Sequence, residues 1–77
     1  MPILTYRAII QKDGDSYRGS VPALIGCNTD GETIEEVRHN LREAISAWIA
    51  TTQEIGWEIP LDESMETIES VEVAAIA

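Results

Sequence analysis

The chain has 77 residues, which is the size of one small domain, and a chain this short hides only about 60% of its extended surface on folding. Its 14 acidic and 5 basic residues give a net charge of −9, which disfavours direct nucleic-acid binding and favours a basic partner. Its one cysteine excludes an internal disulfide. With no secretory signal and no apolar run long enough for a membrane span, we expect a cytoplasmic protein that gains stability as a homodimer or higher homo-oligomer.

The first part of the chain predicts a β-hairpin. Residues 3–12 alternate with period two, which places on one face Leu4, Tyr6, Ala8 and Ile10. The Asp13-Gly14 pair favours a tight turn, and a second strand follows over Ser16–Val21. Pro22 cannot donate to a ladder, so residues 23–26 predict a bend, and Cys27–Asp30 a short third strand.

A long helix should begin after Thr33. The Thr33 hydroxyl can accept from the N–H of Glu36, and the Glu36 side chain can reach back, which makes a capping box. Apolar residues then recur at helical spacing to about Ile55, and Gly56 can close the helix in a left-handed conformation. Residues 68–76 alternate again and predict a last strand.

This order predicts an α+β domain, β-β-β-α-β, covering residues 1–77. Counting strands along the chain, we expect a four-stranded sheet in the order 3-2-1-4 with one helix packed on one face. The other face has no cover, and Ile3 and Ile9 point toward it. These two residues are the predicted oligomer face.

No constellation in the sequence predicts a catalytic, cofactor or metal site, so we expect a protein that is not an enzyme and has no cofactor. His39 lies on the polar side of the helix, where local ion pairs are the simplest interpretation. Cys27 is typical of a small apolar filler. Three aspartates could suggest a metal site, but each has an ordinary turn role: Asp13, Asp15 and Asp30. Trp48 belongs to the apolar helix stripe, whereas Trp57 is the better candidate for an exposed aromatic. Cover of the helix end is the interpretation that we favour for Trp57, and a partner anchor is the alternative.

Several motifs in order resemble the HicB antitoxin family in its stand-alone, single-domain form. Residues 6–17 are similar to its first strand, turn and following tyrosine, and residues 21–27 stand where the family has an aromatic, Pro-Asp-Leu-Pro-Gly and a cysteine. Residues 29–36 match Thr-x-Gly-Asp-Thr-x-Glu-Glu, with Glu32 in place of the aspartate. Residues 41–45 match the helix with its Ala-Ile pair, and residues 56–60 match the Gly-x-x-Ile-Pro ending. Ala23 and Ile25 depart from the family's aspartate and second proline.

The resemblance implies a partial RNase H-like fold, homo-oligomerisation, and neutralisation of a small toxin that degrades RNA. Many such antitoxins carry a further C-terminal DNA-binding segment, and we expect no separate DNA-binding domain in this chain. An orphan homo-oligomeric module with a regulatory or ligand-binding role stays open as the alternative. A basic toxin would be attracted by complementary potential, and the predicted partner interface comprises Glu35, Glu36, Glu43 and Trp57.

Overall fold

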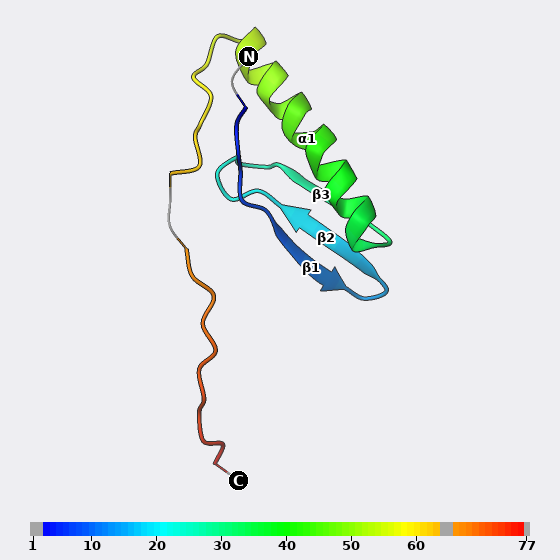
Figure 1. Cartoon of the computed structure of the whole chain (residues 1–77), viewed down its shortest axis with the longest axis vertical. Helices are drawn as coiled ribbons and strands as arrows, with labels where there is room; N and C mark the ends of the chain where they lie inside the picture. The colour runs from blue at the N-terminus through cyan, green and yellow to red at the C-terminus, as the bar shows by residue number, and fades with distance from the viewer. Residues whose placement is uncertain (1–2, 64–65, 77) are drawn as a thin grey trace.

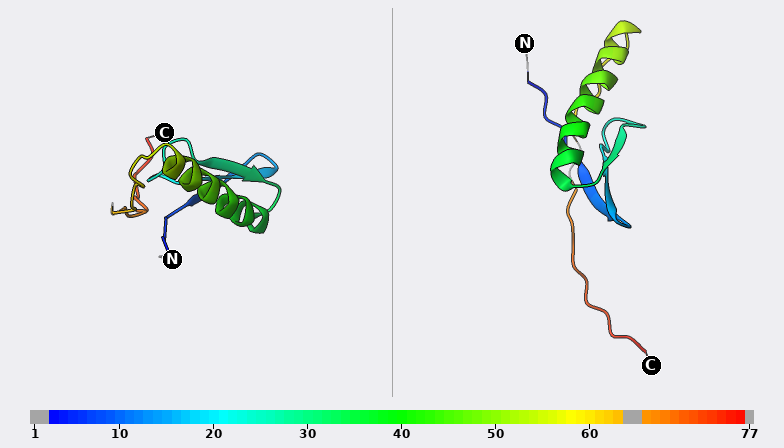
Figure 2. Two further views of the ribbon diagram at one scale, coloured as in Figure 1. Left: turned by 90° about the horizontal axis from the view of Figure 1, so that it is seen from above. Right: turned by 90° about the vertical axis from the view of Figure 1, so that its right-hand side faces the viewer.

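The structure is a computed structural model that describes residues 3–63 and 66–76. In these residues, a three-stranded antiparallel sheet and one helix form the regular structure (Figure 1). The strands β1 (Ile9–Asp13), β2 (Ser16–Ser20) and β3 (Asn28–Gly31) lie in the order β1-β2-β3. The helix α1 (Ile34–Glu54) covers one face of this sheet (Figure 2). After α1 the chain turns back past the start of β1 and then runs away from the sheet.

The β1–β2 hairpin has a tight turn where its sequence predicts one, with a loop of two residues. Asp13 pairs with Ser16, so that Gly14 and Asp15 form the loop. Gly14 has a φ of 63°, whereas no residue other than glycine has a positive φ in the described chain. Glycine at the first loop position followed by a residue of negative φ is the pattern of a type II′ turn, whose twist suits the flanking strands.

Residues 21–27 form a tight loop between β2 and β3, at the place where the proline predicts a bend. The N–H of Val21 donates to the carbonyl of Cys27 over 3.1 Å, and the N–H of Cys27 donates to the carbonyl of Leu24 over 3.0 Å. Leu24 is buried beneath the loop. The loop therefore satisfies its own backbone groups while it places one leucine in the core.

The helix α1 begins and ends where its capping signals predict. The N–H of Glu36 donates to the Thr33 hydroxyl over 3.1 Å, which satisfies a donor that the first turn would leave without a partner. Gly56 follows the helix with a φ of 75°. A side chain at this position would strain the backbone, which is why glycine is favoured there.

The core lies between α1 and the sheet, and glycine lets the two layers approach closely. Gly19 in the middle of β2 faces α1, because a Cβ built on it would lie 2.7 Å from Val37 Cγ1. The buried apolar residues are Val21, Leu24, Cys27, Val37 and Leu41, and the partly buried side chains packed on them are Tyr6, Ile10, Tyr17, Ala44, Ile45 and Trp48. The apolar stripe predicted for the helix is thus the face that it buries.

The sheet face away from α1 is mostly polar. Strand register places Ile10, Gly19 and Thr29 in one row facing α1, so the alternate residues face outward. Of the outward residues in the three strands, only Ile9 is apolar, and it is 39% exposed. Polar residues make up the rest of this face, namely Gln11, Asp13, Ser16, Arg18, Ser20, Asn28 and Asp30.

The prediction of a fourth strand and of a four-stranded, partial RNase H-like sheet in the order 3-2-1-4 is wrong. Residues 66–76 are exposed throughout and are assigned to no strand. Alternating apolar residues give a segment the tendency to extend, but a strand also needs a neighbouring edge with which to pair. Here the chain passes the start of β1 without pairing along it. The first strand is also shorter than predicted, because residues 3–8 have no strand partner.

Candidate partner-binding site

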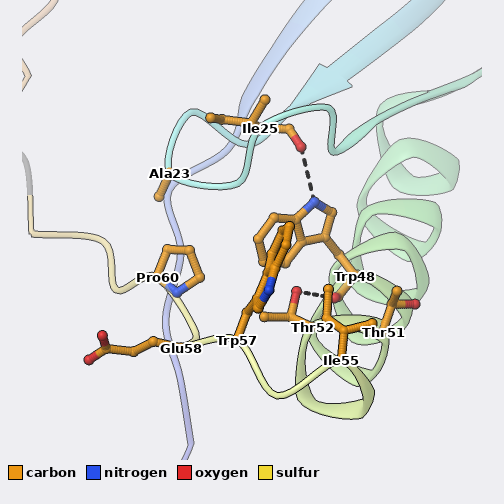
Figure 3. Close-up of a pocket in the computed structure, with 9 residues that line it drawn as sticks. All are labelled: Ala23, Ile25, Trp48, Thr51, Thr52, Ile55, Trp57, Glu58 and Pro60. Carbon is orange, nitrogen blue, oxygen red and sulfur yellow. Dashed lines mark hydrogen bonds between the residues drawn. The ribbon is translucent and has the colours of Figure 1, made fainter.

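An apolar pocket lies at the C-terminal end of α1, and we name it the tryptophan pocket. Its volume is about 560 Å³. Three segments contribute its walls, as Figure 3 shows: the last turns of α1, the loop over residues 21–27, and the chain after the helix. The lining residues are Ala23, Ile25, Trp48, Thr51, Thr52, Ile55, Trp57, Glu58 and Pro60.

Trp48 joins the helix to the loop at the back of this pocket. Its indole Nε1–H donates to the carbonyl oxygen of Ile25 over 3.0 Å, and its ring packs against the core. The Thr52 hydroxyl, one turn further on, donates to the carbonyl of Trp48 over 2.9 Å. The bond from Trp48 to Ile25 fixes the loop relative to the helix, whereas the bond from Thr52 lies within α1. This wall of the pocket is therefore formed in advance of any ligand.

The end of α1 places Trp57 on the opposite side. The N–H of Trp57 donates to the carbonyl of Thr52 over 3.1 Å, and the N–H of Gly56 donates to the carbonyl of Gln53 over 3.1 Å. These two bonds are a Schellman motif. The chain therefore turns sharply at Gly56, and the Trp57 ring comes back over the last turn of the helix, toward the space that Trp48 also faces (Figure 3).

The segment just before β1 holds the chain that follows the pocket. The Tyr6 hydroxyl donates to the carbonyl of Pro60, and burial, with the nearby Asp62 charge, raises the pKa of Tyr6 above its ordinary value of 10.0. Asp62 accepts from the Arg7 backbone N–H over 2.7 Å and from the Arg7 guanidinium over 2.8 Å. Its hydrogen bonds to the guanidinium raise the pKa of Arg7. The pocket is thus closed on its third side by contacts between residues far apart in the sequence.

The rim of the tryptophan pocket exposes large apolar side chains to solvent. Ile25 is 90% exposed, Trp57 72% and Ile55 53%. An exposed apolar rim around a preformed pocket is typical of a binding site for an apolar side chain of a partner or for a small apolar ligand. Glu58 also contributes to the lining, but its carboxylate extends away from the two tryptophan rings (Figure 3). At that position it would suit a cationic group of a partner at the rim of the pocket.

The sequence predicts Trp57 to be the more exposed of the two tryptophans, and it is 72% exposed although it lies at the helix end. Its role as a partner anchor stays a prediction. Ile25, Ile55 and Pro60 are the members of the rim that sequence reasoning missed. One signal was available for Ile25, because an isoleucine between turn residues and Gly26 has no helix or strand to bury it. No local signal places Ile55 and Pro60 on the same pocket, since the turn at Gly56 brings them together.

The three predicted interface glutamates lie elsewhere on α1. Glu35, Glu36 and Glu43 are all exposed, and Glu43 Oε1 lies 3.3 Å from His39 Nε2. Glu35 and Glu36 occupy the first turn, so an α-helical rise of 1.5 Å per residue puts them about 30 Å from Trp57. The structure therefore does not bring them together with Trp57. Exposed Arg38 and Arg42 lie on the same helix and reduce its negative potential.

The remaining candidates occupy ordinary structural positions. Cys27 is buried, and burial raises the pKa of its thiol, which keeps the thiol protonated and unreactive. The two residues of the predicted oligomer face lie in different parts of the chain. Ile3 is exposed in the segment before β1, whereas Ile9 is the first residue of β1. Among residues 3–63 and 66–76, no group of three His, Cys, Asp or Glu side chains could hold a metal ion, and no helix in these ranges has the apolar length of a membrane span.

Comparisons with known proteins agree on one family. The family described as UPF0150-like matches residues 5–60. A UPF0150 protein of Thermoplasma acidophilum is 42% identical over 64 residues, covering 82% of this chain and 93% of that protein. A UPF0150 protein of Thermotoga maritima is 39% identical over 70 residues, covering 88% of each chain.

A solved structure shares the fold as well as the sequence. It is the crystal structure of the N-terminal domain of the Burkholderia pseudomallei antitoxin HicB, with a TM-score of 0.67 and 34% identity. The match covers 75% of this chain and 69% of that one. The similarity therefore covers about three quarters of this chain.

Proposed function

This chain belongs to the UPF0150-like family and is a HicB-like antitoxin-family protein, and we propose that it binds and neutralises a small basic toxin that degrades RNA. The observation that carries the proposal is the similarity to the antitoxin domain, at 34% identity and a TM-score of 0.67. The role is that of a binding protein, which occludes a partner's surface and carries out no reaction itself.

The charge of the chain supports a basic partner. The net charge is −9, and residues 43–77 contain acidic residues but no lysine or arginine. A protein that cleaves RNA must hold a phosphate backbone, so its binding surface is expected to be positive. Complementary potentials would speed association of this chain with the toxin. The bound chain would then compete directly with RNA for the toxin's positive surface.

We place the anchor of this interaction at the tryptophan pocket. A partner's aromatic or aliphatic side chain would enter between Trp57 and Ile25, where an apolar group gains most from leaving water. Glu58 would accept from a neighbouring lysine or arginine of the partner. Glu35, Glu36 and Glu43 would act at longer range, by attracting the basic partner before contact.

The test requires a small basic protein encoded beside this gene, which is purified and combined with the purified chain. Cleavage of a labelled RNA by that protein should stop when the chain is added in equimolar amount. Trp57→Ala should weaken the complex about 30-fold or more, as expected for a loss of 2 kcal/mol at an aromatic anchor. Trp57→Phe should keep most of the affinity, and Ile34→Ala, at the far end of α1, is the matched control.

The charge assignment has its own readout. Reversal of Glu35, Glu36 and Glu43 to lysine should slow association and flatten its dependence on salt, while dissociation changes little. Normal association at low ionic strength would reject the role of these glutamates. An unimpaired toxin in the presence of excess chain would reject the antitoxin function itself.

A second candidate, an orphan module that binds a small ligand, is favoured by one observation. The tryptophan pocket, at about 560 Å³, falls in the range that small-molecule sites occupy. In this case Trp57 fluorescence should respond to a small apolar compound with micromolar affinity, and no basic protein should copurify with the chain. Inhibition of the neighbouring toxin would exclude this candidate as the main role.

A further inference from the structure

The C-terminal segment, residues 66–76, is an extended chain without cover. Every residue in it is exposed, and its large apolar side chains are almost fully so: Ile68 is 100% and Ile76 99% exposed. Val71, Val73 and Ala75 lie on one side of an extended chain, opposite Ser70, Glu72 and Ala74, so the middle of the segment has one more apolar side. Ile68 and Ile76 fall on the other side at the two ends. Such a segment in water leaves both its apolar side and its backbone groups without partners.

The chain also has a free sheet edge. Strand β1 pairs only with β2, so its outer side has no neighbouring strand among the described residues. In a hairpin with a two-residue loop, Asp13 and Ser16 form a hydrogen-bonded pair, and bonding alternates from there. The backbone groups of Lys12 and Ile10 therefore point outward, away from β2. They are ready to pair with another strand.

We propose that residues 68–76 of one copy add as a strand to the outer edge of β1 in a second copy, and that the two copies exchange these segments. The exchange makes a two-fold symmetric dimer, since each copy supplies one strand and one edge. The proposal concerns the chain alone and does not depend on a toxin.

A second copy is favoured because contacts at the base of the segment direct it away from its own sheet. Asp62, whose side chain is only 4% exposed, is held by Arg7 just before β1. Glu66 also lies 3.3 Å from the Arg7 guanidinium. Beyond this point the segment passes β1 and leaves the body, as both Figure 1 and Figure 2 show. The molecule is 57 Å long but only 28 Å across, so the segment can reach a neighbouring copy.

The two surfaces match in polarity and in charge. Val71 and Val73 would continue the apolar layer beneath α1, next to the half-buried Ile10 of the second copy. The segment contains no base, and its Glu69 lies on the same side as Val71 and Val73, the side on which Lys12 projects from the edge strand. Opposite charges on neighbouring strands stabilise their pairing. Backbone hydrogen bonds would supply the affinity, as in other cases of strand addition.

Two proline variants test separately the segment that would add as a strand and the β1 edge that would accept it. Val71→Pro/Val73→Pro removes backbone donors from the segment, and it leaves the folded body intact because the segment is exposed. Lys12→Pro removes an outward donor at a position where β1 makes no bond to β2. Val71→Ile/Val73→Ile and Lys12→Gln keep the donors and serve as the matched controls. Far-ultraviolet circular dichroism verifies that each variant is folded.

Sedimentation equilibrium of the full chain gives the result. The wild type and both controls should show twice the chain mass of 8.5 kDa, and each proline variant should dissociate at least tenfold more readily, since one lost hydrogen bond is worth about 1 kcal/mol at each of two junctions. A mixture of the two proline variants should form a mixed dimer, because one intact segment then meets one intact edge.

The other outcomes overturn the proposal. A monomeric wild type would show that the segment does not pair with a second copy. The segment and the β1 edge would then have to pair with a different protein. A dimer that survives Val71→Pro/Val73→Pro would use another surface, such as Ile3 and Ile9. A dimer that survives Lys12→Pro but not the segment variant would join two segments to each other and not to β1.

Discussion

Arg7 and Asp62 are 55 residues apart in the sequence and share a hydrogen-bonded ion pair. The Arg7 backbone N–H and its guanidinium both donate to the Asp62 carboxylate. With the Tyr6–Pro60 hydrogen bond, this contact attaches the chain after α1 to the segment just before β1. It closes one side of the tryptophan pocket and sets the direction in which the C-terminal segment leaves.

Arg7→Ala should release residues 57–63 from the body. The Asp62 carboxylate would lose its charged donors while it remains mostly buried, and such a group favours a conformation that returns it to water. We expect a lower midpoint of thermal unfolding and faster amide exchange in residues 57–63. Arg42→Ala, on the exposed side of α1, is the control and should leave both unchanged. Equal exchange rates in the two variants would show that the pair does not hold this segment.

Gly19→Ala should destabilise the domain by about 1–3 kcal/mol, because the added methyl forces the helix and sheet apart. The new Cβ would lie 2.7 Å from Val37 Cγ1 and 3.0 Å from Leu41 Cδ1. Urea unfolding followed by circular dichroism measures the change. Ser20→Ala, the next residue on the opposite face, should change stability by much less. A neutral Gly19→Ala would mean that α1 can shift away from β2 without cost.

Trp48→Phe should cost about 1 kcal/mol through the lost bond to the Ile25 carbonyl. The aromatic ring that packs on the core is largely kept, so the effect reports the indole N–H. The loop over residues 21–27 should exchange its amides faster in this variant. Trp57→Phe is the matched control, since Trp57 is 72% exposed. Unchanged exchange in the loop would show that its own hydrogen bonds suffice to fix it.

Stability should fall as the pH rises through the folded-state pKa of Tyr6. The pKa of Tyr6 is raised above 10.0 by burial and by Asp62, so the folded state holds this proton more tightly than the unfolded state. The stabilisation is then fully present below pH 10 and is lost at higher pH. Cys27, raised above its ordinary 9.0 by burial, adds a loss that starts at a lower pH.

Urea unfolding at several pH values separates the two groups. Tyr6→Phe should flatten the decline above pH 10, and Cys27→Ala should flatten the part that begins near pH 9. A Tyr6→Phe variant whose stability declines with pH as steeply as that of the wild type would show that this hydroxyl does not couple folding to pH.

Local signals in the sequence predicted the elements that local physics controls. Thr33 with Glu36 fixed the start of α1, Gly56 its end, and Gly14 the hairpin loop, because each acts on backbone groups a few residues away. The apolar stripe predicted the buried face of the helix, and the motif order predicted the family. Trp57 stood out because it follows Gly56, outside the apolar stripe of the helix.

Only the tertiary structure decided what depends on partners distant in the chain. The tryptophan pocket needs the turn at Gly56, the bond from Trp48 to Ile25, and the anchoring of Asp62 by Arg7. Residues 68–76 have the alternation of a strand, yet they form none within the described chain. A helix satisfies its backbone within its own segment, whereas a strand depends on an edge supplied elsewhere, and the sequence alone does not say where that edge lies.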